Sequence, residues 1–273
     1  MTYFYCARQK LSEMLLYTPT PIVEITDPIV EKAGVRLLMK REDLNHPLVS
    51  GNKWWKLKYN LEEAQQQNKK TLLTFGGAYS NHIYATAAAA SELGFNCIGI
   101  IRGEETLPLN NTLSFAKQQR MNLHYVSREQ YRTKATPEFI NRLQQQFGDF
   151  YLIPEGGTNK LAVTGATEFA QTLGHDFDYV CCAVGTGGTL AGLIRGLPSK
   201  KTIGFSVLKN GEFLKHDVQS WVGEKPNWEI VTDYHFGGYA KTTRALEQFI
   251  QQFEERNNTP LEHVYTGKMM AGV

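Results

Sequence analysis

The sequence has few of the features that mark secreted, membrane or metal-binding proteins. Its four cysteines among 273 residues are an adjacent pair in an apolar run, Cys181 and Cys182, and two isolated residues, Cys6 and Cys97. This spacing matches neither a zinc site nor a disulfide framework, so we expect no bound metal and a reducing compartment. No run approaches the roughly 18 apolar residues that span a bilayer, and the N-terminus lacks a secretory signal pattern. We therefore expect a cytoplasmic protein with no membrane partner.

The chain also lacks an excess of charge of one sign. It has 29 basic and 27 acidic residues, a formal net charge of +2, and the two signs are interspersed along the chain. Because it has no basic stripe of the kind that binds nucleic acid, we expect no nucleic-acid partner. Sequence repeats and low-complexity linkers are absent too, so a second domain would have to be interleaved with the first.

Short apolar runs with strand character alternate with helical patterns along most of the chain. The predicted strands cover residues 36–40, 71–75, 96–101, 122–126, 150–154, 179–184 and 202–207. The helical patterns cover residues 56–67, 81–93, 110–120, 137–147, 159–173, 188–196 and 242–256. Such alternation is typical of parallel sheets with helices on both faces, so we predict an open α/β fold.

A glycine-rich stretch follows the predicted strand 179–184, where α/β sheets bind ligands. It reads GTGGT at residues 185–189 and precedes a helical pattern. Glycines let backbone N–H groups converge on an anion, and the helix dipole favours negative charge there. The stretch lacks the lysine of a P-loop and the third glycine of a dinucleotide motif, which favours a small single phosphate over a nucleotide. The alternative is a turn that merely lets strand and helix pack closely.

Two other loop-to-helix junctions carry candidate chemical groups. Ser80 and Asn81 follow two glycines and are good helix N-caps, and such a junction is also suited to binding a carboxylate. Lys53 lies directly before a helical pattern. An isolated lysine is most often a surface charge, but a partly buried amine beside Trp54 or Trp55 is suited to attack a carbonyl and form a Schiff base. With a single-phosphate site, this lysine suggests pyridoxal 5′-phosphate (PLP).

Six motifs occur in the order typical of one enzyme family. They are KRED (40–43), SGNKWWKLKYN (50–60), GGAYSNH (76–82), PEGGTN (154–159), GTGGT (185–189) and VYTGK (264–268). From about residue 17 to its end, the chain resembles the 1-aminocyclopropane-1-carboxylate (ACC) deaminase and D-cysteine desulfhydrase family. The resemblance implies PLP as cofactor and the tryptophan synthase β-subunit-like fold, fold type II, with two open parallel-sheet domains.

The resemblance also implies a role for each matching residue. Lys53 matches the lysine that forms the Schiff base and, once released as an amine, the base that removes the α-proton. Ser80 matches the contact to the substrate carboxylate, and Asn81 the side chain near the 3′-oxygen of PLP. Tyr265 and Tyr239 match aromatic residues that face the substrate. The implied phosphate-binding residues are Gly185, Thr186, Gly187, Gly188 and Thr189.

Position 266 bears on the choice of reaction. ACC deaminases have the motif VYEGK at this place, and its glutamate lies near the pyridine nitrogen of PLP. This chain has Thr266 instead of the glutamate. Threonine cannot keep that nitrogen protonated, so the electron sink needed for ring opening would be weaker. We therefore predict β-elimination of the D-cysteine desulfhydrase kind on a small amino acid, giving pyruvate, ammonia and sulfide. ACC deamination is the alternative.

The resemblance finally implies a homodimer of subunits with an interleaved domain arrangement. Residues 56–150 would form a smaller α/β domain inserted into a larger cofactor-binding domain of residues 1–55 and 151–273. Family members continue beyond the motif VYTGK for longer than this chain does, so we expect a C-terminal part to be missing. Two other functions therefore stay open: a truncated PLP-binding homologue with little or no activity, and a nucleotide-binding α/β module.

Overall fold

The computed structural model describes residues 15–174 and 176–273 and divides the chain into two compact units. Of the described residues, unit 1 comprises Leu15–Pro19 and Leu44–Glu155, and unit 2 comprises Thr20–Asp43 and the residues from Gly156 to Val273. Residues 44–55, which the sequence analysis assigned to the larger domain, therefore lie in unit 1. The physical reason is the burial of large aromatic side chains of this segment among other residues of unit 1.

Unit 1 contains a four-stranded parallel sheet of strand order β5-β4-β3-β6. Its strands are β3 (Thr71–Gly76), β4 (Asn96–Arg102), β5 (Met121–Val126) and β6 (Tyr151–Ile153). Its helices are α3 (Asn52–Gln66), α4 (Asn81–Glu92), α5 (Asn111–Gln118), α6 (Arg128–Arg132) and α7 (Pro137–Phe147). Short 3-10 turns, η1 (Glu42–Leu44) and η2 (Glu155–Gly157), lie where the chain passes between the units.

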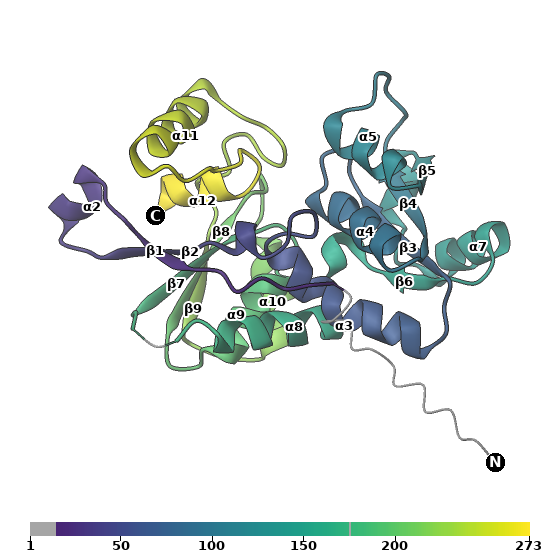
Figure 1. The fold of residues 1–273 in the computed structure, drawn as a ribbon, viewed down its shortest axis with the longest axis horizontal. Coiled ribbons are helices and arrows are strands. Elements are labelled where there is room, and N and C mark those ends of the chain that lie inside the picture. Colours follow the sequence, from purple (N-terminus) through teal and green to yellow (C-terminus); the bar gives the residue numbers. More distant parts are fainter. Residues whose placement is uncertain (1–14, 175) are drawn as a thin grey trace, which may run out of the picture. The chain divides into compact units, whose positions relative to one another are not determined.

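Alternating side chains of β3 separate the two faces of this sheet. Leu73 and Phe75 point to one face and form a core with Phe139 and Leu143 of α7. Thr74 points to the opposite face, where its hydroxyl meets a side chain of α4. Figure 1 shows α4 and α7 on opposite sides of the strands. The near-continuous apolar sequence of β3 is explained by burial on both faces.

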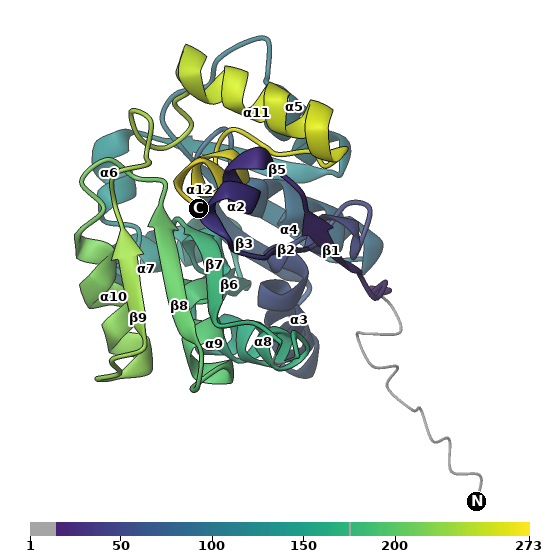
Figure 2. The same cartoon turned by 90° about the vertical axis from the view of Figure 1, so that its left-hand side faces the viewer.

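Unit 2 contains two sheets. A three-stranded parallel sheet has the order β7-β8-β9, and a two-stranded antiparallel sheet pairs β1 with β2. The strands are β1 (Ile22–Ile25), β2 (Leu37–Lys40), β7 (Tyr179–Val184), β8 (Lys201–Ser206) and β9 (Trp228–Val231). The helices are α2 (Pro28–Ala33), α8 (Lys160–Gln171), α9 (Gly188–Gly196), α10 (Phe213–Val222), α11 (Arg244–Asn257) and α12 (Thr266–Gly272). Figure 2 shows the three parallel strands side by side.

Two hydrophobic clusters hold these elements together. In one, α9 and α10 pack on β7 and β9 through Leu190, Ile194 and Val218. In the other, α11 and α12 pack on the β1-β2 sheet through Phe253 and Met270. The C-terminal helix α12 is thereby part of a packed core, which fixes the direction of the residues at its start.

All seven predicted strands are confirmed to within about two residues, which is the usual uncertainty of strand ends. Parallel pairing is confirmed for six of them, but the expectation is wrong for β2, which pairs antiparallel with β1. The sequence analysis missed β1 and β9, which have four residues each. Strands this short carry too few residues to display a periodic pattern.

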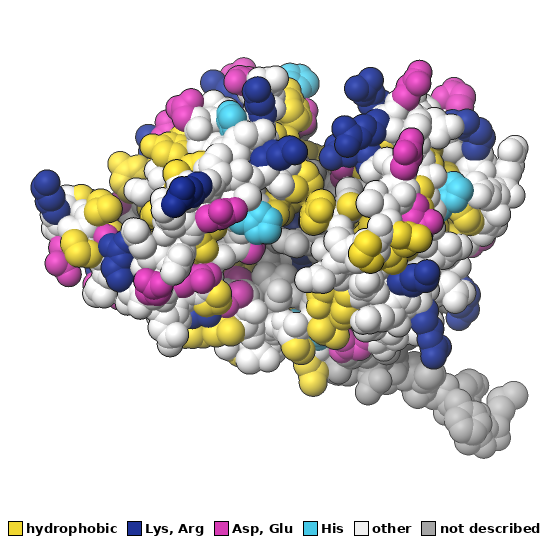
Figure 3. Space-filling model, turned by 90° about the horizontal axis from the view of Figure 1, so that it is seen from above, with side chains coloured by type: hydrophobic (Ala, Val, Ile, Leu, Met, Phe, Trp, Pro, Cys, Tyr) yellow, Lys and Arg dark blue, Asp and Glu magenta, His cyan; other side chains and the backbone are white. Residues whose placement is uncertain are grey.

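Charged side chains of both signs are interspersed on the face shown in Figure 3, as the balanced composition leads one to expect. Among the helices of the described ranges, none combines the length and apolar character needed to cross a membrane.

Candidate functional site

The first predicted site residue, Lys53, lies in the first turn of α3, which begins at Asn52 and not at residue 56 as predicted. Gly51 before it has a φ of +68°, a conformation that suits glycine. The side chain of Asn45 fixes this turn, because its Oδ1 accepts from Gly51 N–H and its Nδ2 donates to Gly51 O, both at 3.0 Å. Lys53 is half-buried and its Nζ donates to Asn52 Oδ1 at 3.1 Å. A rigid turn therefore places the lysine.

The two tryptophans after Lys53 anchor α3 in unit 1. Trp54 and Trp55 are 3% and 5% exposed, and each ring lies about 5 Å from the ring of Tyr17. The indole N–H of Trp54 donates to the Leu15 carbonyl at 3.2 Å. The ammonium of Lys58 lies over both indoles. The adjacent tryptophans thus hold the start of α3 against residues 15–17.

A second lysine on α3 is more deeply buried than the predicted one. Lys56 lies three residues after Lys53, on the same helix face, and is 2% exposed. Burial, and then the charge of Lys53, hold the pKa of Lys56 well below its usual value. The sequence analysis missed Lys56, although the three-residue spacing of the lysines in KWWK was the available signal.

His82, at the start of α4, belongs to the same region of unit 1. Burial is the main cause that lowers its pKa well below 6.5, followed by the charges of Lys53 and Lys56. The hydroxyl of Thr74 donates to the Ile153 carbonyl at 2.8 Å, so at 2.7 Å it accepts from His82 Nε2. This pairing selects the neutral imidazole with its proton on Nε2. Through the hydroxyl of Thr74, the histidine therefore connects α4 to β3 and β6.

Ser80 and Asn81 occupy the junction between β3 and α4. Ser80 is 8% exposed and caps the helix, its Oγ accepting from Ile83 N–H at 3.3 Å. The turn is tight, because a Cβ placed on Gly76 would lie 2.5 Å from Ile83 Cγ1 and 2.8 Å from Ser80 Oγ. Asn81 is exposed at the first position of the helix. The structure therefore bears out the capping interpretation of Ser80, while the ligand contacts of both residues stay predictions.

In unit 2, the glycine loop connects β7 to α9 where the sequence analysis predicted it. Gly187 has a φ of +76°, and a Cβ placed there would lie 2.7 Å from Val218 Cγ2. The hydroxyl of Thr186 hydrogen-bonds that of Thr158 at 2.6 Å, and the same threonine lies close to Gly156. Residues of the motif PEGGTN therefore pack against the loop GTGGT and hold its shape.

The start of α9 differs from the start of α8, its neighbour. Asn159 caps α8 by accepting from Ala162 N–H at 2.9 Å. At α9 the N-cap residue is Gly187, which has no side chain to cap the helix. Because the first N–H groups of a helix need acceptors and carry partial positive charge, this junction is suited to an anion.

The two predicted substrate-facing tyrosines of unit 2 lie next to each other beside the same loop. The ring centroids of Tyr239 and Tyr265 are 6.1 Å apart, with an edge-to-face angle of 73°. A Cβ placed on Gly185 would lie 3.1 Å from Tyr265 Cε1. The structure therefore brings both tyrosines and the first glycine of the loop together.

Glu262 fixes the backbone that carries Tyr265. Its carboxylate accepts from the N–H groups of Val264, Tyr265 and Thr266 at 2.8, 2.5 and 2.9 Å. In return, the hydroxyl of Thr266 accepts from Glu262 N–H at 2.9 Å. Thr266 is exposed, and this contact gives its hydroxyl a structural role beside the predicted cofactor contact. The sequence analysis missed Glu262, because the cap precedes the helix by four residues.

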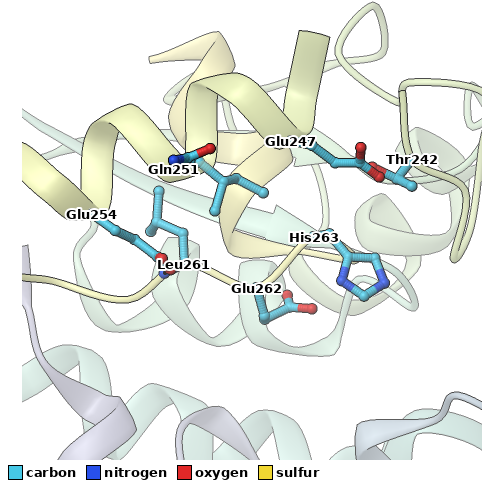
Figure 4. A pocket seen from close by; sticks show the side chains of 8 residues that line it. Thr242, Glu247, Gln251, Glu254, Leu261, Glu262 and His263 are labelled. Atoms are coloured by element: carbon cyan, nitrogen blue, oxygen red, sulfur yellow. Dashed lines mark hydrogen bonds between the residues drawn. The ribbon is translucent and has the colours of Figure 1, made fainter. Parts of the chain in front are cut away.

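A pocket of about 510 Å³ lies between α11 and the segment that follows it. Figure 4 shows Glu247, Gln251 and Glu254 on α11, with the carboxylate of Glu247 toward Thr242 and that of Glu254 toward Leu261, and Glu262 and His263 on the following segment. No predicted site residue of the described chain lines this pocket, and the carboxylates of Glu254 and Glu262 already accept backbone N–H groups. In the described ranges, no group of three or more His, Cys, Asp or Glu side chains is arranged to hold a metal ion.

Known proteins share both the sequence and the fold. Residues 14–273 match the family described as pyridoxal-phosphate dependent enzymes. The D-cysteine desulfhydrase of Klebsiella pneumoniae is 28% identical over 95% of this chain and 86% of its own length. The bifunctional, mitochondrial D-cysteine desulfhydrase/1-aminocyclopropane-1-carboxylate deaminase of Arabidopsis thaliana is 29% identical over 95% and 71%.

The fold is that of fold type II PLP enzymes. The crystal structure of an ACC deaminase homologue is 27% identical, covers 96% of this chain and 88% of that one, and superposes with a TM-score of 0.82. The resemblance seen in the six motifs is thereby confirmed, and the chain belongs to the family of pyridoxal-phosphate dependent enzymes.

Proposed function

We propose that this PLP-dependent enzyme catalyses β-elimination on a small amino acid of the D-cysteine kind. The observation that carries the proposal is the start of α3, where a rigid Gly51 turn presents the half-buried Lys53 next to the buried Lys56 and His82. A lysine amine held in such surroundings is suited to condense with an aldehyde. D-cysteine desulfhydrases among the relatives support the substrate class.

The residues of the chain fit PLP at two places. At α9, backbone N–H groups lie at a helix N-terminus whose N-cap residue, Gly187, has no side chain to accept from them, which suits a phosphate. At α3, burial and then the charge of Lys53 hold the pKa of Lys56 well below its usual value, and an anion bound nearby would raise it. PLP, when bound, supplies an aldehyde for the substrate's amino group and a ring that withdraws electrons from its α-carbon.

Different side chains bind the cofactor, bind the substrate and transfer the proton. The amine of Lys53 holds the cofactor and, once free, takes the proton from the substrate α-carbon. Ser80 Oγ accepts from the helix, so its hydroxyl hydrogen can donate to the substrate carboxylate, and Asn81 binds near the 3′-oxygen of PLP. Tyr239 and Tyr265 orient the substrate. Loss of the β-substituent as sulfide follows removal of the α-proton.

ACC deamination is the second candidate, favoured by the relative of Arabidopsis thaliana that carries both activities. Thr266 disfavours it, because a threonine at this position cannot hold the pyridine nitrogen protonated. We also propose a cytoplasmic homodimer, supported by the family resemblance; light scattering of the purified protein tests the dimer.

Spectroscopy and turnover together test the function. We expect the purified protein to show the visible absorbance of lysine-bound PLP and to release pyruvate and sulfide from D-cysteine. A Lys53→Ala variant should lose the absorbance band and about 10²- to 10⁴-fold in turnover, the usual contribution of a catalytic base. Lys58→Ala, a lysine on the same helix, is the control. Turnover of ACC but not of D-cysteine would reverse the order of the two candidates.

A further inference from the structure

The loop that carries Tyr239 has an unusual backbone. Within residues 235–241, Phe236, Gly237, Gly238 and Ala240 have φ angles of +47°, +93°, +108° and +53°. Side-chain-bearing residues such as Phe236 and Ala240 avoid this region, at a cost of about 1 kcal/mol each. The surroundings must therefore hold the loop in shape.

Hydrogen bonds within the loop stabilise part of this backbone conformation. His235 accepts from Gly237 N–H through Nδ1 and from Gly238 N–H through its carbonyl, each at 3.0 Å. The Gly238 carbonyl accepts from Lys241 N–H at 3.1 Å. These bonds close the turn on itself, but they do not fix its position relative to other elements of unit 2.

Lys268 of α12 supplies a bond from another element. Its Nζ donates to the Gly238 carbonyl at 2.6 Å, and the residue is 1% exposed. Lys268 lies three residues after Tyr265, so the helix start that carries one tyrosine also carries the amine that holds the loop of the other. The two rings meet edge to face at 6.1 Å.

Stability alone does not explain a lysine here. Burying an ammonium group costs more than a single hydrogen bond to a neutral carbonyl returns, so methionine would fill the space at lower cost. Burial lowers the pKa of Lys268, while the charge of Glu262 raises it, in agreement with an amine held away from water. The buried amine of Lys268 joins α12 to the loop of residues 235–241, and its energetic cost is better explained by the position that it gives this loop.

We propose that Lys268 is a positioning residue, which through the Gly238 carbonyl sets the ring of Tyr239 against that of Tyr265. The inference rests on the proposed function in one respect: the tyrosine pair is taken to orient the amino-acid substrate. The link between Lys268 and the loop itself is a property of unit 2 and is measurable without turnover.

The test compares the PLP-loaded wild-type protein with Lys268→Met and with Lys241→Met. Lys241 is an exposed lysine on the same loop and serves as the matched control. Loss of the buried charged hydrogen bond should speed hydrogen–deuterium exchange in residues 236–241 by about tenfold and raise KM for D-cysteine by a similar factor. The PLP absorbance band, the affinity for PLP and kcat should stay within about twofold, a factor worth only about 0.4 kcal/mol. Lys241→Met should match the wild type.

A double-mutant cycle separates positioning from general stability. If Lys268 acts through Tyr239, the double variant Lys268→Met/Tyr239→Ala should have the KM of Tyr239→Ala alone. Multiplied effects on KM, or unchanged exchange in residues 236–241, would overturn the proposal. If wild-type protein turns over no amino acid, the proposed function fails, and the exchange result still decides the link between Lys268 and the loop. Should Lys268→Met not fold, Lys268→Leu replaces it under the same criteria, since it also lacks a donor for Gly238.

Discussion

The junctions β3-α4 and β7-α9 are built in different ways. At β3-α4 the chain supplies its own partners, because Ser80 caps the helix and His82 locks it to the sheet. At β7-α9 the N-cap is Gly187, which has no side chain. The first junction caps its helix with its own serine, whereas the second has no N-cap side chain, and we propose the phosphate there. Substitution of the buried His82 of α4 should therefore mainly affect stability, and substitution of Gly187 mainly ligand binding.

The strongest test of this contrast is Gly187→Ala. The φ of +76° and a contact of 2.7 Å to Val218 would force the loop to move, so we expect PLP affinity to fall by about 100-fold. Gly223→Ala is the control, because Gly223 has a similar φ of +71° with no atom within 4 Å of the added carbon. Titration of the apoprotein with PLP measures both. Equal losses would mean that backbone strain, and not a phosphate site, explains the effect.

Lys56→Met asks whether the buried amine of α3 also contributes to anion binding. We expect PLP affinity to fall by about tenfold, the value of a charge-assisted hydrogen bond. Affinity for pyridoxal, which lacks the phosphate, should not change. Lys58→Met, which removes a lysine stacked over Tyr59, should bind both compounds as the wild type does. An equal loss for PLP and pyridoxal would refute the role of Lys56 at a phosphate.

His82 should make the α4 junction sensitive to acid. Its folded pKa lies well below 6.5, so near and below that pH the unfolded chain binds more protons. Stability from neutral His82 is therefore present above about pH 6.5 and is lost as the pH falls, by at most about 1.4 kcal/mol per pH unit. Urea unfolding between pH 5 and 7.5 measures this. His82→Gln should remove the dependence, whereas His216→Gln, at a side chain 91% exposed, should keep it.

Ser80→Ala should have the smallest effect. Loss of the cap should lower the free energy of unfolding by about 1 kcal/mol. Ser127→Ala, which removes the capping box of α6, should cost a similar amount. If Ser80 also binds the substrate carboxylate, only Ser80→Ala raises KM, by about fivefold, which corresponds to about 1 kcal/mol. An unchanged KM would restrict Ser80 to capping.

The local chemistry of the junctions could be read from the sequence because it depends on neighbouring residues. Glycine before a helix, serine at an N-cap and an apolar run before a glycine loop are visible in one stretch of chain. Burial of lysines could not be read in this way. Lys56 and Lys268 have the residue type that most often faces water, and only the elements packed over them make them interior groups.

The sequence by itself determined the family, the parallel α/β pattern and the positions of the two junctions, because six ordered motifs and the alternation of apolar runs with helical patterns are properties of the linear chain. Only the tertiary structure decided that β1 pairs antiparallel with β2, that Tyr239 meets Tyr265, and that Lys268 reaches Gly238. Each of these depends on segments far apart in sequence. Their contacts form only when packing brings the segments together, and the pattern of neighbouring residues does not specify which distant segments meet.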